Sequence, residues 1–157
     1  MDISAIMTTA VHACSPDDMA STAASIMWNR DCGTVPVVDS DLKVVGIITD
    51  RDICMATYTR GQPPQDIRVA DVMSQPPFCC SPRDSVIAVE RMMQERQIRR
   101  VPVVSDGRLV GIVSLGDLAR RLRTDAPGDQ ELSTTQVAQT LGAISYPHPG
   151  RAPLAAF

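Results

Sequence analysis

Two stretches of the chain carry the signals of a helix, and in the second of them apolar residues recur with a helical period. In the second stretch three of them lie at steps of three and four residues, the spacing of one buried helix face: Val86, Val89 and Met93. A Ser-Pro-x-Asp sequence precedes each stretch, at Ser15 and at Ser81, and offers a hydroxyl N-cap, a proline at the first helical position and an acid in the first turn. These signals predict two helices that begin there and end near Arg30 and Arg96.

Each predicted helix is followed by two short runs of β-branched residues with a polar turn between them. The runs cover residues 35–38 and 43–48 in the first half of the chain, and 101–104 and 109–113 in the second. Such runs around a polar turn are typical of β-hairpins. A further short helix is expected directly after each hairpin, over residues 50–59 and 115–123.

The two halves of the chain repeat each other at an almost constant spacing. The Val-Pro-Val-Val run at 35–38 recurs at 101–104, an offset of 66 residues. After the turn the offset is 65, so that 45–49 matches 110–114. A structural repeat tolerates the loss of one residue in a turn. The order helix, strand, strand, helix is therefore expected twice.

A small sheet with helices on one face leaves its other face uncovered, so two such units are expected to pack sheet against sheet. The predicted fold is thus α/β (α+β), with two units related by a pseudo-two-fold axis. We place the first repeat at residues 1–62 and the second at 63–124. The remaining residues, 125–157, lie outside the repeat and form a tail with a short helix near 131–141.

Composition and charge narrow the classes of function. A chain of 157 residues that is 44% hydrophobic and 21% charged suffices for one compact soluble domain or two half-domains, and excludes a multidomain enzyme. Only 3% of the residues are aromatic, which disfavours a stacking platform for single-stranded nucleic acid. Residues 67–124 carry a net charge of +4 in a chain of net charge −3, so the basic groups are concentrated in the second repeat.

Several chemistries have no matching motif in the sequence. No apolar run is long enough for a membrane span and the N-terminus lacks the features of a signal peptide, so we expect a cytoplasmic protein with no membrane contact. The five cysteines show no C-x-x-C spacing and there are only two histidines, which favours reduced, buried thiols and no metal site. Phosphate-loop and nucleophile-elbow motifs are missing as well, and we expect no enzymatic activity.

The most informative motif lies where each hairpin meets its second helix. A glycine in the strand allows a ligand to approach the backbone, a hydroxyl ends the strand, and an aspartate three residues later opens the helix: Thr49 and Asp52 in the first repeat, Ser114 and Asp117 in the second. That carboxylate can accept hydrogen bonds from the two hydroxyls of a ribose, while the helix N-terminus favours anionic groups. Each pair can also serve as a capping box with no ligand.

The sequence around this motif resembles the CBS-domain family. The resemblance rests on Val-Pro-Val-Val, a polar turn, and then Gly-Ile-Ile-Thr-Asp-Arg-Asp-Ile in one repeat and Gly-Ile-Val-Ser-Leu-Gly-Asp-Leu in the other, together with Met7, Met73 and the Ser-Pro sequences. It covers residues 1–124 and implies a tandem CBS pair, or Bateman module. Such proteins commonly bind AMP, ADP, ATP or S-adenosylmethionine as regulatory ligands in clefts between the repeats, require no other cofactor, and often form flat homodimers.

The resemblance implies a first cleft in which Thr49 and Asp52 face Arg99 and Arg100. Two prolines would lie near the base of the ligand, Pro76 and Pro77, and Arg51 would assist at the phosphates. Guanidinium groups suit this task because their planar donors match phosphate oxygens.

A second cleft is implied around Ser114 and Asp117. These residues would face Gly33 and Thr34, with Ala10 and Val11 near the base of the ligand. This cleft would hold little fixed positive charge unless Arg120 or Arg121 turns into it.

Two interpretations of the function follow. In the first, the chain senses an adenosine-containing ligand that bridges the repeats and changes their packing or that of a homodimer. In the second, the chain is a ligand-free scaffold for dimerisation or for docking of a regulated partner protein, with the tail from Asp125 as a docking element. The arginines of the second repeat would then be a solvated face, and the overall negative charge disfavours nucleic acid as a partner.

Overall fold

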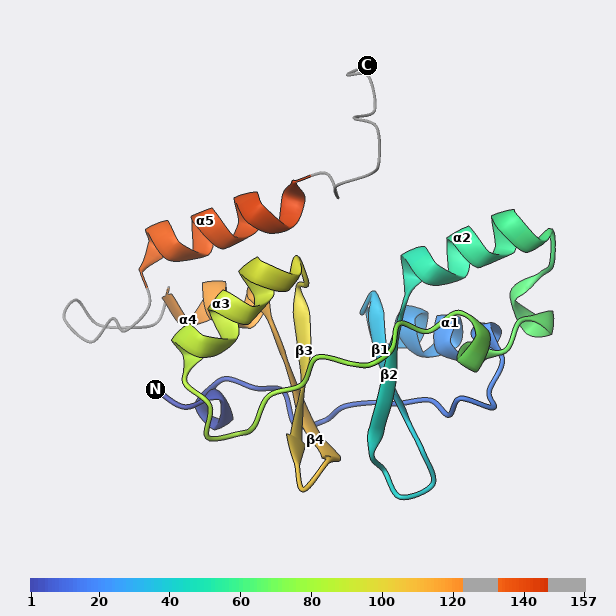
Figure 1. Ribbon diagram of the computed structural model, residues 1–157, viewed down its shortest axis with the longest axis horizontal. Helices are drawn as coiled ribbons and strands as arrows, with labels where there is room; N and C mark the ends of the chain where they lie inside the picture. Colours follow the sequence, from blue (N-terminus) through green and yellow to red (C-terminus); the bar gives the residue numbers. More distant parts are fainter. Residues whose placement is uncertain (123–132, 147–157) are drawn as a thin grey trace, which may run out of the picture.

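Two lobes with the same order of elements lie side by side (Figure 1). The computed structural model describes residues 1–122 and 133–146. The first lobe contains α1 (Ala20–Asn29), β1 (Thr34–Val38), β2 (Val44–Thr49) and α2 (Asp50–Arg60), and the second contains α3 (Val86–Arg96), β3 (Arg100–Ser105), β4 (Arg108–Ser114) and α4 (Leu115–Leu122). Three short 3-10 helices are η1 (Ile3–Ala5), η2 (Pro64–Asp66) and η3 (Val69–Asp71), and the last described helix is α5 (Thr134–Ser145). The predicted order helix, strand, strand, helix is confirmed in both halves.

The two sheets are antiparallel hairpins with corresponding registers. Pro36 pairs with Ile47 in the first hairpin, and Pro102 pairs with Ile112 in the second. The hairpins lie towards the middle of the molecule and the helices lie outward (Figure 1). Their tips meet, where the N–H of Val44 donates to the carbonyl of Gly107 at 3.3 Å. The predicted α/β (α+β) fold, with two small sheets facing each other about a pseudo-two-fold axis, is confirmed.

The first helix of each lobe begins later than the sequence signals predict. α1 begins at Ala20 and α3 at Val86. The Ser-Pro-x-Asp sequences form turns instead, because the aspartate side chain accepts the backbone N–H of the serine, at 2.7 Å between Ser15 and Asp18 and at 2.8 Å in the second lobe. The predicted helix starts were therefore wrong, and it is Ser85 whose hydroxyl caps α3.

The segment that leads into each repeat packs against the other repeat. Ile3 is fully buried in the core of the second lobe, and Val69 is fully buried in the core of the first. Backbone pairing holds the crossing, because Thr8 exchanges hydrogen bonds with Ile112 of β4 at 2.9 Å in both directions. The two lobes are interlocked by these crossing segments rather than merely adjacent.

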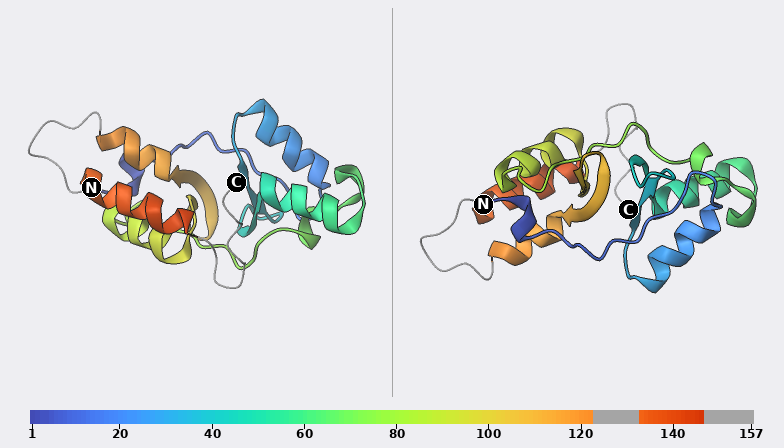
Figure 2. Two further views of the ribbon diagram at one scale, coloured as in Figure 1. Left: turned by 90° about the horizontal axis from the view of Figure 1, so that it is seen from above. Right: turned by 90° about the horizontal axis from the view of Figure 1, so that it is seen from below.

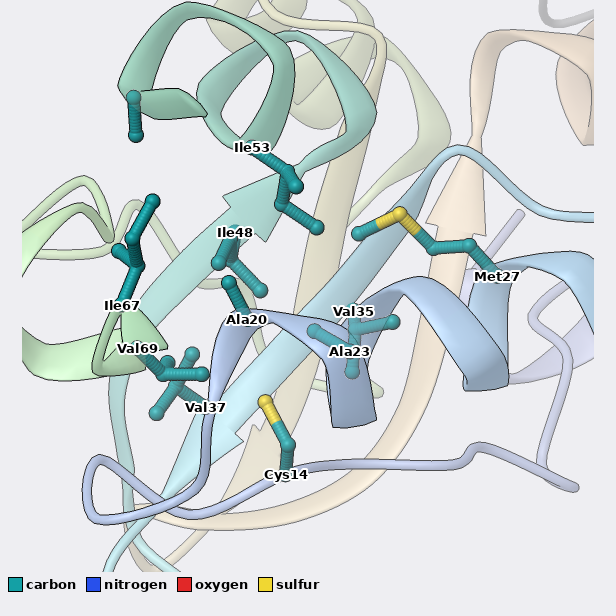
Figure 3. Close-up of a cluster of buried hydrophobic side chains, with 11 residues drawn as sticks. Cys14, Ala20, Ala23, Met27, Val35, Val37, Ile48, Ile53, Ile67 and Val69 are labelled. Atoms are coloured by element: carbon teal, nitrogen blue, oxygen red, sulfur yellow. The ribbon is translucent and has the colours of Figure 1, made fainter. Parts of the chain in front are cut away.

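Each lobe has its own hydrophobic core, built from equivalent positions. Figure 3 shows the core of the first lobe, which consists of Cys14, Ala20, Ala23, Met27, Val35, Val37, Ile48, Ile53, Ala56, Ile67 and Val69. The second core consists of Ile3, Cys80, Val86, Val89, Met93, Val101, Val103, Val113, Leu118 and Ile144. α1 contributes alanines where α3 contributes valines, so the second core has the larger side chains along this helix.

α5 lies across α3 and α4 and belongs to the second lobe (Figure 2). Ile144 is 8% exposed and joins the second core. The fully buried hydroxyl of Thr140 donates to the buried carboxylate of Glu90 on α3, and Gln97 donates to a carbonyl near the end of α5 at 2.9 Å. The predicted helix near 131–141 is present but ends later, and residues 131 and 132 lie outside the described part. None of the helices in this part is long and apolar enough to cross a membrane.

Candidate functional site

A cleft of about 780 Å³ lies between the two lobes. The cleft is enclosed by the N-terminal lead-in, the residues that follow α1, the beginnings of β1 and β3, the junction of β4 with α4, and one face of α5. Its volume lies within the range of about 300–1,000 Å³ that is usual for small-molecule sites. Both lobes contribute side chains, so a ligand in this cleft would contact both.

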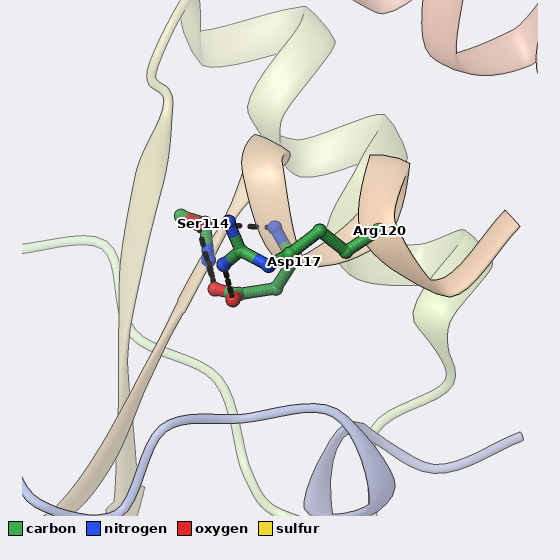
Figure 4. A network of polar contacts seen from close by, with 3 residues as sticks. All are labelled: Ser114, Asp117 and Arg120. Atoms are coloured by element: carbon green, nitrogen blue, oxygen red, sulfur yellow. Dashed lines mark hydrogen bonds and ion pairs between the residues drawn. The ribbon is translucent and has the colours of Figure 1, made fainter. Parts of the chain in front are cut away.

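The junction of β4 with α4 carries the Ser114–Asp117 pair (Figure 4). Oδ2 of Asp117 accepts the backbone N–H of Ser114 at 2.7 Å and its hydroxyl at 2.6 Å, and the hydroxyl accepts the N–H of Asp117 in return. The other oxygen, Oδ1, forms an ion pair with Arg120. The side chain of Asp117 is 10% exposed and that of Arg120 is 71% exposed. The capping box thus uses one carboxylate oxygen and leaves the other to a solvent-exposed guanidinium.

Arg100 and Thr34 meet on the pseudo-two-fold axis at the cleft. The two positions are equivalent in the two repeats, and the guanidinium of Arg100 donates to the hydroxyl of the buried Thr34 at 3.3 Å. Arg100 pairs with Ser114 in the register of β3 and β4, which brings it to the same strand end as the capping box. Arg30, Arg99 and Arg120 also line the cleft. The cleft thus contains four arginines and only two aspartates, which are Asp31 and Asp117, so its net charge is positive.

The structure brings together most of the residues predicted for the second cleft. Ser114, Asp117, Thr34, Ala10 and Val11 all line it. Gly33 does not line it and instead borders a separate groove between α1 and α2. Arg120 lines the cleft, as the sequence allowed, whereas Arg121 does not.

The residues predicted for the first cleft are divided. Arg99 and Arg100 were predicted to face Thr49 and Asp52. They instead line the cleft that contains Ser114 and Asp117. Thr49 and Asp52 form the same capping box at the start of α2, with 2.7 Å between the Thr49 hydroxyl and Oδ2 of Asp52. Thr49 and Asp52 border neither the cleft nor the groove. The same holds for the other residues predicted there, which are the exposed Arg51, the exposed Pro76 and the half-buried Pro77.

The glycines that precede the two motifs, Gly46 and Gly111, lie against methionine side chains of the lead-in segments. A Cβ on Gly46 would lie 2.6 Å from Sδ of Met73, and a Cβ on Gly111 would lie 2.8 Å from Sδ of Met7. The close approach that the sequence predicted is therefore made by the crossing lead-in segments rather than by a ligand. The repeated Met7 and Met73 are explained by the same contact.

Sequence reasoning missed several residues of the cleft. His12, Arg30 and Asp31 line it, as do Val137 and Leu141 of α5. The repeat pattern gave no signal for α5, because this helix has no counterpart in the first half of the chain. Arg30 and Asp31 directly follow α1, where the pattern indicated only the end of a helix.

A second hollow of about 990 Å³ lies on the outer face of the first lobe, between α1 and α2. We call it the α1/α2 groove, and it is lined by Ala24, Met27, Trp28, Asp31, Cys32, Gly33, Asp50, Ile53, Cys54, Thr57 and Pro64. Ala24 is equivalent in the repeat to Glu90, which α5 contacts in the second lobe. The groove is thus the first lobe's version of the surface that α5 covers.

The five cysteines are free thiols with different environments. Burial raises the pKa of Cys14 to about 11, with a further contribution from the negative charge of Asp18. Burial likewise raises the pKa of Cys80 to about 12, and that of Cys79 above its usual value. Cys54 is exposed, which departs from the predicted burial of all five. Residues 1–122 and 133–146 contain no group of three or more His, Cys, Asp or Glu side chains placed to hold a metal ion.

The paired hairpins, the crossing lead-ins and the duplicated Ser/Thr-x-x-Asp caps define a tandem CBS pair. The sequence model of the CBS domain matches residues 3–58 and 69–124, and the chain belongs to the CBS-domain family. A similar protein is the CBS domain-containing protein YhcV of Bacillus subtilis, which is 41% identical over 113 residues, or 72% of this chain and 79% of YhcV.

Two solved structures are similar in fold. The crystal structure of Hypoxic Response Protein I, which holds two coordinated zinc ions, has a TM-score of 0.72 and 31% identity over 78% of this chain and 99% of that one. The CBS domain pair of MJ0100, in complex with 5′-methylthioadenosine and S-adenosyl-L-methionine, has a TM-score of 0.70 and 27% identity over 77% of this chain and 94% of that one.

Proposed function

We propose that the cleft at Ser114 and Asp117 binds an adenosine-containing ligand, such as AMP, ADP, ATP or S-adenosylmethionine, and that the chain is a regulatory module rather than an enzyme. The carboxylate of Asp117 carries this proposal. Its Oδ2 is engaged by Ser114, while its Oδ1 is bound by the exposed end of Arg120. A ribose diol can take the place of that guanidinium, because the side chain of Arg120 is 71% exposed and free to turn away.

The charge of the cleft supports a ligand with phosphate or another anionic group. Arg120, once displaced from Asp117, remains beside Arg99 and Arg100 at the edge of the cleft. Several guanidinium groups offer paired donors to phosphate oxygens. The MJ0100 pair, which binds two adenosine derivatives, supports the assignment of the nucleoside part.

Regulation would follow from the position of the ligand between the lobes. Asp117 belongs to the second lobe, whereas Thr34 belongs to the first, and both line the cleft. A ligand that contacts both binds one arrangement of the lobes more tightly than others, and this difference in affinity shifts the population towards that arrangement. The ligand is then sensed as a change in packing between the repeats.

Calorimetric titration with AMP, ATP and S-adenosylmethionine tests the proposal. In Asp117→Asn the amide oxygen can still accept from Ser114, but an amide NH₂ replaces the oxygen that would accept from the ribose. Loss of a hydrogen bond to a charged group corresponds to about 10- to 150-fold weaker binding. Failure of all three compounds to bind the wild-type protein, or unchanged affinity in Asp117→Asn, would overturn the proposal.

The Thr49–Asp52 pair provides the matched variant. Asp52→Asn makes the same change in the capping box of the other repeat. If this pair also binds a ligand, as the sequence predicts, Asp52→Asn lowers the stoichiometry from two sites to one. If the only site is at Asp117, Asp52→Asn binds as the wild type does.

We also infer that the chain forms a homodimer through the α1/α2 groove. Trp28 beside this groove is 88% exposed, and Tyr58 on α2 is 79% exposed. The equivalent surface of the second lobe is covered by α5, which shows that this type of surface accepts a packed helix. A second copy of the first lobe would cover the exposed aromatic side chains in the same manner. The cytoplasmic location stays a prediction from the sequence.

A further inference from the structure

We propose that α5 is part of the ligand site and that docking of α5 on the second lobe is coupled to ligand binding. The proposal rests on the proposed function of the cleft. The CBS domain match ends at residue 124, so α5 is an addition to the repeats. Its apolar face nevertheless reaches the cleft between them.

Val137 and Leu141 place α5 at the cleft. Both residues line it, one turn apart on the helix. Leu141 is 51% exposed, which is unusual for a leucine on the packed side of a helix. A ligand that fills the cleft would cover this side chain and remove its apolar surface from water. The ligand therefore gains affinity from α5 only when α5 is docked.

α5 is held on the second lobe by Thr140 and Ile144, and Val137 also packs against the second core. Thr140 and Ile144 lie on the same face as Val137 and Leu141, at helical spacing. Ile144 enters the second core, and Thr140 donates to Glu90. Val137 thus takes part in both docking and the cleft, whereas Thr140 contacts only the second lobe and Leu141 lines the cleft, so the two roles can be altered separately at these two positions.

Glu90 opposes docking of α5, because docking buries its carboxylate. Its side chain is 3% exposed beneath α5, and the hydroxyl of Thr140 is bonded to its carboxylate. Withdrawal of a carboxylate from water opposes docking, while burial of Ile144 favours it. In the first lobe, which α5 does not cover, the equivalent residue is Ala24. The acid is therefore specific to the lobe with the added helix, and its desolvation lowers the net free energy gained when α5 docks.

Coupling of this kind is reciprocal. If the ligand binds the α5-docked state more tightly, it increases the docked fraction, and any change that lowers the docked fraction weakens ligand binding. The apparent dissociation constant rises in inverse proportion to the docked fraction. A partner that binds α5 would then respond to the ligand through the change in the docked fraction of this helix.

Hydrogen exchange of the α5 backbone, with and without AMP, ATP or S-adenosylmethionine, tests the coupling in the full chain. In the wild-type protein the compound that binds is expected to slow exchange across residues 134–145. Thr140→Val removes the donor to Glu90 without touching the cleft, so it should speed α5 exchange and weaken binding by the factor by which the docked fraction falls. Leu141→Ala should leave α5 exchange unchanged in the absence of ligand, weaken binding about tenfold, and reduce the protection that the ligand confers.

Gln139→Ala, at an exposed position on α5, is the control and should behave as the wild type does. If a compound binds the wild type and binds Leu141→Ala and Thr140→Val equally well, the role of α5 is overturned while the proposed function stands. If the ligand binds but leaves α5 exchange unchanged, the coupling is likewise overturned. If none of the three compounds binds the wild type, both proposals are overturned together.

Discussion

Ile3 shows how strongly the fold depends on the crossing of the lead-in segments. It is completely buried in the core of the second lobe, although it begins the first repeat in the sequence. Ile3→Ala removes three carbon atoms from this core. At about 0.8 kcal/mol per buried carbon the lost transfer free energy is about 2.4 kcal/mol, and the cavity left behind raises the expected loss to about 3–4 kcal/mol.

Leu42→Ala is the matched control, because it removes the same number of carbon atoms from a side chain that is 59% exposed. Its effect on the free energy of unfolding should be within about 0.5 kcal/mol. Urea unfolding gives both values, and hydrogen exchange locates the change. In Ile3→Ala, exchange should increase most in α3, β3 and β4. In Val69→Ala it should increase most in α1, β1 and β2.

A decrease of less than about 1 kcal/mol in the free energy of unfolding of Ile3→Ala would refute the reasoning, since truncation of a fully buried isoleucine to alanine destabilises a core by about 2–5 kcal/mol. An increase in exchange confined to the first lobe would refute it as well. That result would mean that the N-terminal segment packs against its own repeat in solution. The floor of the cleft between the lobes would then differ, because Ala10 and Val11 follow in the same segment.

Two further predictions concern the surface and the thiols. Trp28→Ser should convert a homodimer to a monomer in light scattering coupled to size-exclusion chromatography, and a wild type that is monomeric at all concentrations would contradict the proposed interface. The raised pKa values of Cys14 and Cys80 mean that the unfolded chain releases thiol protons above pH 9 that the folded chain retains. Their contribution to stability is therefore intact below pH 9 and is lost as the pH rises towards 11–12, by about 1.4 kcal/mol per pH unit for each thiol. Urea unfolding between pH 8 and 10.5 should show that the free energy of unfolding falls less steeply with pH in Cys80→Ala than in the wild type. Equal slopes in the two proteins would contradict this prediction.

Local patterns in the sequence were sufficient for the elements and for the caps. The offset of 66 residues revealed both repeats, and the capping boxes at Thr49 and Ser114 formed where the spacing predicted them. These features depend on contacts between residues close in sequence, so they can be inferred without the fold. The predicted helix starts failed for a local reason too, because the side chains of Asp18 and Asp84 close a turn that competes with the first turn of a helix.

The tertiary structure alone decided how the repeats combine. The crossing that brings Ile3 to the second lobe, the meeting of Arg100 with Thr34, and the addition of Leu141 to the cleft all join residues far apart in the sequence. Such contacts depend on which surfaces remain uncovered after each lobe has formed, and a repeat pattern is the same for every way of arranging its copies. The sequence by itself therefore determined that two Ser/Thr-x-x-Asp motifs exist, and the packing of the lobes with α5 decided which side chains surround each motif.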